Sequence, residues 1–202
     1  MPLRQGHKRT NIKMGFSAKD LELTKKRIRS KILAKLNSQK EEERKRKSEL
    51  IKKKLFRTTV FQKAKRVMFY ISFDGEVNTQ DMIKEAQDLG KIVAVPVCVN
   101  DRVIKPCILR NKARLIKGPY GVCEPAIKKL INLEDLDLVI VPGVAFDKKG
   151  NRLGRGKGCY DYFLKKLTSR RVPSIGLAFD FQILPSIPAS SEDVSLDRVI
   201  FA

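Results

Sequence analysis

The sequence has no tryptophan, a single histidine and only four cysteines among its 202 residues. The histidine, His7, lies near the start, and the cysteines at 98, 107, 123 and 159 form no C-x-x-C pair. Structural zinc sites take their ligands from closely spaced cysteine and histidine residues, so the sequence gives no indication of such a site. Cysteines scattered in this way are typical of a reducing compartment, where they behave as small apolar side chains.

Long apolar runs are also missing. No segment approaches the roughly 20 apolar residues of a membrane helix, and the first residues lack the apolar segment of a secretory signal. Residues 1–19 contain five cations and no acid, as transit peptides do, but Pro2, Gly6 and Gly15 interrupt helix formation there. We therefore expect a cytoplasmic monomer without a membrane partner, and a mitochondrial location stays open.

Acidic residues are scarce in the first third of the chain. Residues 1–66 hold 23 Lys and Arg against 6 Asp and Glu, a net charge of +17 out of +21 for the whole sequence. Such a charge excess is typical of a solvated helical face, and it also suits a polyanionic small molecule or a nucleic acid. Only three aromatic residues occur in this region, and no recognition motif is visible, so a nucleic-acid partner is the weaker interpretation.

The helical spacing of apolar residues begins after an irregular start. We predict a flexible basic arm over residues 1–16 and one α/β domain over residues 17–202. From residue 18 a helical stripe is formed by Leu21, Ile28, Ile32 and Leu36. Ser38 and Glu41 have the spacing of a capping box and predict the start of a second helix there. Thr58 or Thr59 then predicts the start of a short helix that reaches Lys63.

Apolar runs alternate with helical segments in the rest of the chain. The predicted strands include residues 66–72, 92–99, 138–141, 172–179 and 198–201. This alternation predicts a three-layer α/β sandwich, with a mostly parallel central sheet, helices on both faces and basic N-terminal helices. In such sheets ligands bind outside the carboxyl ends of the strands, where residues 72–76 and 142–161 are expected. Asn78 is predicted to be the N-cap of the helix that follows the first strand.

The stretch 142–161, PGVAFDKKGNRLGRGKGCYD, combines five glycines with the cations Arg152, Arg155 and Lys157. Such a loop suits an anion bound at a helix N-terminus. It is not a Walker A loop, because Lys157 is followed by glycine, and its alternating glycines do not match a dinucleotide fingerprint. Asp161 either complements the helix dipole or binds Mg²⁺, and Cys159, beside these cations, is predicted to have a lowered pKa and to be reactive.

Two cations of the first predicted helix, Lys25 and Arg29, are four residues apart and share a helix face. They are either ordinary surface charges or a pair directed at one phosphate.

Three strings, residues 142–147 (PGVAFD), 150–158 (GNRLGRGKG) and 160–161 (YD), together closely resemble the signature of the 5-formyltetrahydrofolate cyclo-ligase family. The resemblance extends over most of the chain. It implies ATP- and Mg²⁺-dependent ring closure of 5-formyltetrahydrofolate to 5,10-methenyltetrahydrofolate, with release of ADP and phosphate. The alternatives are a nucleic-acid-binding protein and a sugar-phosphate or CoA-type enzyme on a similar scaffold.

The resemblance also implies roles for individual residues. It implies ATP binding by Lys25, Arg29, Arg152, Gly154, Arg155, Gly156, Lys157, Gly158, Cys159 and Tyr160. It implies folate binding by Ile71, Glu76, Arg155, Gly156, Lys157, Gly158 and Cys159. It implies Mg²⁺ binding by Asp161 and Asp193, and a catalytic part for Arg155, Lys157 and Tyr160. Cys159 departs from the family, which commonly has a tyrosine at this position, and this puts one ring contact to the pterin in doubt.

Overall fold

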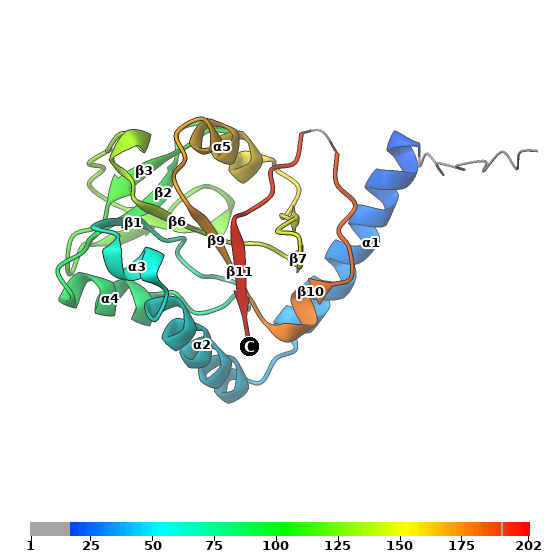
Figure 1. The fold of residues 1–202 in the computed structure, drawn as a ribbon, viewed down its shortest axis with the longest axis horizontal. Coiled ribbons are helices and arrows are strands. Elements are labelled where there is room, and N and C mark those ends of the chain that lie inside the picture. The colour runs from blue at the N-terminus through cyan, green and yellow to red at the C-terminus, as the bar shows by residue number, and fades with distance from the viewer. Residues whose placement is uncertain (1–16, 191) are drawn as a thin grey trace, which may run out of the picture.

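The computed structural model describes residues 17–190 and 192–202, so the predicted arm over residues 1–16 lies outside the described residues. The central sheet has six strands in the order β11-β9-β6-β1-β2-β3 (Figure 1). These strands are β1 (Arg66–Met68), β2 (Ile92–Cys98), β3 (Ile104–Ile108), β6 (Leu138–Val141), β9 (Ser174–Ala178) and β11 (Arg198–Phe201). Every neighbouring pair is parallel except β2 and β3, so the predicted mostly parallel sheet is confirmed.

Helices cover both faces of this sheet (Figure 1). On one face lies α5 (Cys159–Thr168), and on the other lie α2 (Glu41–Phe56), α3 (Thr59–Lys63) and α4 (Gln80–Asp88). Strand β6 shows why both faces need a covering layer of helices. All four of its residues are buried, and successive side chains point to opposite faces of the sheet. Leu138 and Ile140 join the apolar cluster that includes α2, α3 and α4, while Val139 and Val141 join the cluster of α5. The predicted three-layer arrangement is confirmed.

The first helix, α1 (Ala18–Asn37), follows the predicted apolar stripe. Ile32 and Leu36 are buried in the cluster on the α2 side, with Ile28 packed against it. The capping box predicted at Ser38 and Glu41 is wrong. Ser38 instead ends α1, where its backbone N–H donates to the carbonyl of Ala34 at 3.1 Å, and α2 begins without a side-chain cap.

The first strand is shorter than predicted and leads into a turn that reaches the start of α4. Thr79 explains the early end of β1, because its hydroxyl donates to the carbonyl of Tyr70 at 2.6 Å and accepts from the backbone N–H of Ser72 at 3.1 Å. Thr79, rather than the predicted Asn78, is the N-cap of α4, although the Asn78 side chain still accepts from the N–H of Gln80 at 2.9 Å. A side chain therefore satisfies backbone groups that a longer strand would have paired.

Two smaller sheets complete the described structure. One contains β7 (Ala145–Asp147), β8 (Arg152–Leu153) and β10 (Ile183–Leu184), and the other contains β4 (Leu115–Lys117) and β5 (Cys123–Pro125). A turn over residues 148–151 joins β7 to β8, and the carboxylate of Asp147 accepts from the N–H groups of Lys149 and Asn151 at 2.9 and 3.0 Å. Gly150 has φ +85°, a left-handed conformation that glycine adopts without strain.

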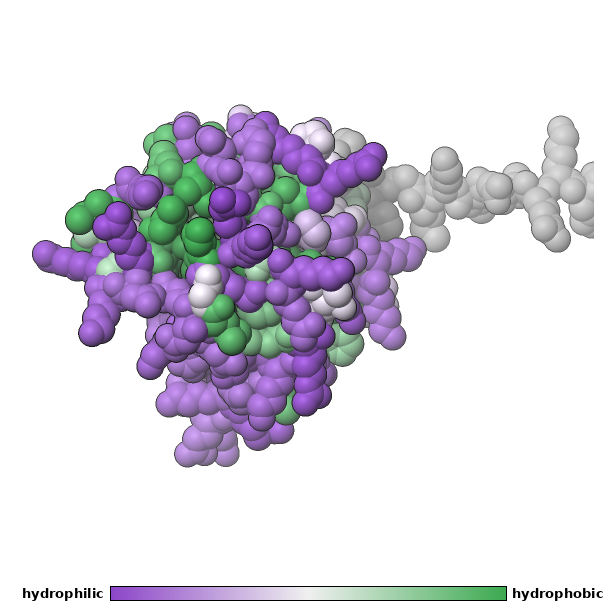
Figure 2. Space-filling model, turned by 60° about the vertical axis from the view of Figure 1, so that its left-hand side comes forward, coloured by the Kyte–Doolittle hydropathy of each residue, from purple (hydrophilic) through white to green (hydrophobic). Residues whose placement is uncertain are grey.

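Figure 2 shows one face of the molecule, largely covered by hydrophilic residues that surround a smaller apolar area. Part of the basic charge is paired within α2, where Arg44 binds Glu41 at 2.7 Å and Arg46 binds Glu43 at 2.8 Å. Exposed pairs of this kind contribute little to stability and are common on solvated helices. Among residues 17–190 and 192–202, no helix combines the length and the apolar character that crossing a bilayer requires.

Candidate active site

A pocket of about 630 Å³ opens at the carboxyl ends of three parallel strands. Its wall includes residues at or just beyond the ends of β1, β2 and β6, namely Tyr70, Ile71, Pro96, Cys98, Pro142 and Gly143. Open α/β sheets bind ligands at this edge, because the loops that follow neighbouring strands converge there. The two loops that the sequence singled out, residues 72–76 and 142–161, both contribute to this pocket.

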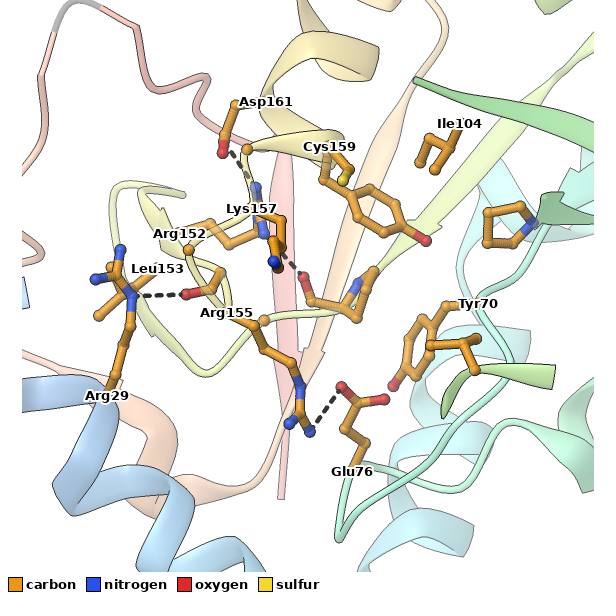
Figure 3. Close-up of a pocket in the computed structure, with 18 of the residues that line it drawn as sticks. Arg29, Tyr70, Glu76, Ile104, Arg152, Leu153, Arg155, Lys157, Cys159 and Asp161 are labelled. Atoms are coloured by element: carbon orange, nitrogen blue, oxygen red, sulfur yellow. Dashed lines mark hydrogen bonds and ion pairs between the residues drawn. The ribbon is translucent and has the colours of Figure 1, made fainter. Parts of the chain in front are cut away.

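The pocket brings together every residue that the sequence predicted for the site. The set comprises Lys25, Arg29, Ile71, Glu76, Arg152, Gly154, Arg155, Gly156, Lys157, Gly158, Cys159, Tyr160, Asp161 and Asp193. In Figure 3, Arg29 reaches in from α1, Glu76 lies on the opposite side, and the loop that carries Arg155 and Lys157 runs between them. Their individual roles stay predictions.

Carboxylates of the pocket pair with Lys25, Arg29, Arg152 and Arg155. Lys25 donates to Asp193 at 2.6 Å, Arg29 to Glu22 at 2.8 Å, and Arg152 to Asp161 at 2.7 Å. Arg155 pairs with two carboxylates of the 72–76 turn. An anionic ligand can take over such cations if the carboxylates are released, so this arrangement suits the binding of phosphates.

Arg152 is the most buried of these cations, with a side chain only 3% exposed. Its guanidinium donates to Asp161 and, at 3.3 Å, to the carbonyl of Pro142 (Figure 3). Its Nε atom has no hydrogen-bond partner within the described part of the chain. Gly154 makes room for the guanidinium, because a Cβ atom on Gly154 would lie 2.7 Å from its Nη1 atom. A larger residue at 154 would therefore have to displace the end of the Arg152 side chain from its contacts with Asp161 and Pro142.

The last two glycines of the loop have a different role. Gly156 and Gly158 have φ values of +100° and +73°, which L side chains rarely adopt. Gly158 is the N-cap of α5, so the chain turns from β8 into the helix within five residues. The first residues of α5, Cys159, Tyr160 and Asp161, line the pocket. The N–H groups of the first turn and the positive end of the helix dipole therefore lie at the pocket, where an anion is expected.

On the opposite side of the pocket, Glu76 is only 8% exposed, and its carboxylate accepts from the N–H of Phe73 at 3.3 Å. Burial raises the pKa of Glu76 to about 7, although the guanidinium of Arg155 opposes that shift. This carboxyl therefore occurs in both protonation states near neutral pH.

Two tyrosines lie near Glu76. The hydroxyl of Tyr160 is buried without a hydrogen-bond partner among the described residues, whereas that of Tyr70 donates to the carbonyl of Val77 at 3.1 Å. Burial, with Glu76 adding to it, raises the pKa of both tyrosines, so both hydroxyls keep their protons. A polar aromatic ligand would find a carboxyl and an unsatisfied hydroxyl here, and burying the latter without a partner costs about 1–3 kcal/mol.

The prediction of a lowered pKa for Cys159 is wrong. Burial raises the pKa of its thiol, and the nearby Lys157 only partly opposes this shift. The Sγ atom lies 3.5 Å from the carbonyl oxygen of Asp101, to which it donates. Cys98, in the same wall, has a pKa raised to about 11, by burial first and then by Glu124. Both side chains are therefore thiols at neutral pH and line the pocket as small apolar groups.

The predicted magnesium ligands do not form a metal cluster by themselves. Among residues 17–190 and 192–202, no group of three or more His, Cys, Asp or Glu side chains could hold a metal ion. Asp161 and Asp193 both line the pocket, each with its side chain 23% exposed and each paired with a cation. Because Mg²⁺ commonly takes one or two carboxylates and completes its shell with water and phosphate oxygens, these residues fit Mg²⁺ bound together with a nucleotide.

Several residues of the pocket were missed by the sequence reasoning. Glu124 is 3% exposed, and its carboxylate accepts from the backbone N–H of Cys98 at 2.7 Å and pairs with Lys128 at 2.7 Å. No local pattern marks Glu124 as a pocket residue, because the backbone N–H that it accepts from lies on β2. Phe73 and Asp74, in contrast, lie in the 72–76 stretch that the sequence singled out, three and two residues before Glu76, but no individual role was predicted for them.

Comparison with known proteins gives a consistent result. Residues 22–202 match the profile of the 5-formyltetrahydrofolate cyclo-ligase family. The 5-formyltetrahydrofolate cyclo-ligase of Mus musculus is 31% identical over 197 residues, which cover 92% of this chain and 97% of that protein. The corresponding protein of Escherichia coli K12 is 32% identical over 141 residues and covers 68% of this chain and 78% of its own length.

Solved structures agree with the sequence matches. The structure of 5,10-methenyltetrahydrofolate synthetase from Aquifex aeolicus superposes with a TM-score of 0.78 at 34% identity, over 88% of this chain and 89% of that one. The family profile covers far more than half of the chain, including both loops of the pocket. The chain therefore belongs to the 5-formyltetrahydrofolate cyclo-ligase family, and with that family to the ligases.

Proposed function

We propose that this protein catalyses the ATP- and Mg²⁺-dependent ring closure of 5-formyltetrahydrofolate to 5,10-methenyltetrahydrofolate, with release of ADP and phosphate. The observation that supports this reaction most is the composition of the pocket. One side carries cations from α1 and from the glycine loop, as a triphosphate requires, and the other side carries Glu76, Ile71 and Tyr160, as a pterin requires. Both reactants of a phosphoryl transfer can therefore meet in one cavity.

This reaction requires the protein to align the two substrates and to neutralise the charge of the phosphates, and it does not require a nucleophilic side chain. The formyl oxygen is a poor leaving group, and transfer of the γ-phosphoryl group from ATP to this oxygen makes it a good one. N10 of the folate then attacks the formyl carbon, phosphate departs, and the N10 proton is lost to solvent. Lys25, Arg29 and Arg152 hold the phosphates, while Arg155 and Lys157 offset charge on the transferred group. Tyr160, with its unsatisfied buried hydroxyl, donates to a substrate oxygen.

Asp161 and Asp193 would hold Mg²⁺ together with the nucleotide. Bound there, the ion neutralises charge on the phosphates. Lys25 and Arg152, now paired with these two carboxylates, would then transfer to phosphate oxygens. Nucleotide and metal are thus expected to bind with positive cooperativity, because each releases a partner that the other needs.

Buried side chains form the part of the pocket that is expected to bind the pterin ring. Glu76 accepts hydrogen bonds from pterin N–H groups when it is ionised, and Ile71 with Ile104 provides an apolar wall. At position 159 this chain has a cysteine, which is smaller than the tyrosine common in the family. We therefore expect the pterin ring to fit more loosely against this wall.

The proposal is tested by supplying 5-formyltetrahydrofolate, ATP and Mg²⁺ and following product absorbance together with phosphate release. We expect turnover that disappears when ATP or Mg²⁺ is omitted. Arg155→Ala and Asp161→Asn are expected to lower kcat by about 100-fold or more, as loss of a charge-stabilising group does. Arg46→Ala and Asp88→Asn remove the same charges at exposed positions outside the pocket and serve as controls. A folded wild-type protein without turnover would contradict the proposal.

A further inference from the structure

The guanidinium of Arg155 is held on three sides by a single turn. Its Nη1 atom donates to Asp74 at 2.8 Å, its Nη2 atom lies 3.5 Å from Glu76, and its central carbon lies 4.3 Å from the centre of the Phe73 ring. Arg155 belongs to the glycine loop before α5, whereas these three partners lie between β1 and α4. This one side chain therefore bridges the two loops that form the pocket (Figure 3).

The turn that carries these partners has an unusual backbone conformation. The N–H of Glu76 donates to the carbonyl of Phe73 at 3.2 Å, and both Asp74 and Gly75 have positive φ, +52° and +78°. Positive φ at a residue other than glycine is uncommon and persists where surrounding contacts fix it. One such contact comes from the link between α1 and α2, where the Gln39 side chain donates to the carbonyl of Gly75 at 3.2 Å. Asp74 thus contacts Arg155 from a tight turn that is hydrogen-bonded at both of its following residues.

The two carboxylates differ in their distance from Arg155 and in their exposure to solvent. Asp74 is the outer one, with its side chain 44% exposed, and it makes the shorter contact. Glu76 is the inner one, with its side chain 10% exposed, and its contact is longer. The exposed carboxylate thus draws the guanidinium toward the mouth of the pocket and away from the buried one. Without Asp74, the positive charge would be free to pair more closely with Glu76, since a buried carboxylate gains most from a partner.

We propose that Asp74 is a positioning residue for Arg155, with the Phe73 ring as its platform, and that it keeps Arg155 from pairing fully with Glu76, so that Glu76 stays available to the substrate. The proposal rests on the proposed function, in which Arg155 and Glu76 contact the reactants. Asp74 and Phe73 lie outside residues 142–161, the segment on which the resemblance to the family was based.

Burial and Asp74 on the same turn raise the pKa of Glu76, whereas Arg155 on the glycine loop and the backbone N–H of Phe73 lower it. Tyr70 after β1 and Tyr160 on α5 also interact with Glu76, because its charge adds to the burial that raises the pKa of both hydroxyls. Removing the charge of Asp74 therefore lowers the pKa of Glu76 twice, by ending a repulsion and by releasing Arg155 toward it.

The experiment compares the wild type with Asp74→Asn, Asp74→Glu and Phe73→Leu, and with Asp88→Asn as a control for the loss of one exposed negative charge. Steady-state kinetics give KM for 5-formyltetrahydrofolate and for ATP across pH. A second readout does not depend on turnover: carbon-13 NMR of labelled glutamate carboxyls follows the titration of Glu76, assigned through its absence in Glu76→Gln.

For Asp74→Asn we expect KM for 5-formyltetrahydrofolate to rise about 3- to 10-fold with KM for ATP changed less, since Glu76 then competes with the substrate for Arg155. The Glu76 titration and the corresponding limb of the pH profile move to lower pH. In Asp74→Glu, KM for 5-formyltetrahydrofolate and the Glu76 titration should both lie near their wild-type values. In Phe73→Leu, both should change in the same direction as in Asp74→Asn, but less.

The proposal is overturned if Asp74→Asn, folded by its thermal transition, matches Asp88→Asn in both KM and the Glu76 titration. If Asp74→Asn fails to fold, Asp74→Glu and Phe73→Leu decide, and wild-type values for Phe73→Leu in both readouts also overturn it. An inactive wild type with the expected NMR shift would remove the proposed function but leave the positioning of Arg155 intact.

Discussion

Replacing Glu76 by glutamine measures how strongly the pocket disfavours a buried negative charge. The carboxyl has an ordinary pKa of 4.5, which is raised to about 7 in the folded protein, by burial first. A carboxyl with a higher pKa in the folded chain supports folding only while it is protonated. Its contribution is complete below the unfolded pKa and is lost as pH rises through the folded one. At about 1.4 kcal/mol for each pKa unit, the ionised carboxyl costs about 3 kcal/mol at pH values near 8.

Glutamine has nearly the same shape as protonated glutamate and does not titrate. We therefore expect the Tm of Glu76→Gln relative to wild type to increase by about 6–12 °C between about pH 5 and pH 8, at about 2–4 °C per kcal/mol for a chain of this size. The measurement is a series of thermal unfolding curves across that range without ligand. The change with pH is decisive, because any packing defect of glutamine shifts both ends alike.

Glu42→Gln is the matched control, because Glu42 is exposed in the first turn of α2. Its Tm difference from wild type should stay nearly constant over the same range, apart from a small helix-dipole effect. If the Glu76→Gln difference were equally constant, Glu76 would be ionised throughout, and the argument from burial would be refuted.

Two further predictions concern the wall of the pocket. Glu124→Ala should destabilise the fold by about 1.5–3 kcal/mol, because it leaves the backbone N–H at the end of β2 without its charged acceptor, whereas Glu124→Gln keeps an acceptor oxygen and should cost less. Denaturant midpoints measure both, and equal losses would contradict this role. Alkylation of Cys159 at neutral pH should be slower than that of the exposed Cys123, because burial raises the pKa of the Cys159 thiol. Mass spectrometry of the modified peptides compares the two rates, and faster modification of Cys159 would show that the thiol is activated after all.

The family assignment replaces the sugar-phosphate and CoA-type alternatives that the sequence had left open. The glycine and cation spacing of residues 150–158 was the most informative part of the chain, because it excluded two common phosphate loops before any family was considered. The strand at Leu138–Val141 was equally readable, since a run of four apolar residues that ends in proline and glycine suits a strand buried on both faces.

Local patterns were less reliable at the ends of elements. Ser38 and Glu41 have the spacing of a capping box, yet the chain uses Ser38 to finish α1. Asn78 is a good N-cap by type, yet Thr79 takes that place while its side chain pairs with the backbone beyond β1. In both cases several residues could have capped the helix, and packing selected among them.

The sequence by itself determined the α/β architecture and the two loops, residues 72–76 and 142–161, that meet at the pocket. Apolar periodicity dictates which face of each element is buried, and the order of strands and helices dictates where their loops converge. Only the tertiary structure decided the state of the side chains in that pocket. The partners of Arg155 are more than 75 residues earlier in the chain, and Lys25 meets a carboxylate 168 residues away. Whether a loop cysteine is activated or a glutamate is held near neutrality depends on burial and on such distant charges, and no local spacing encodes either.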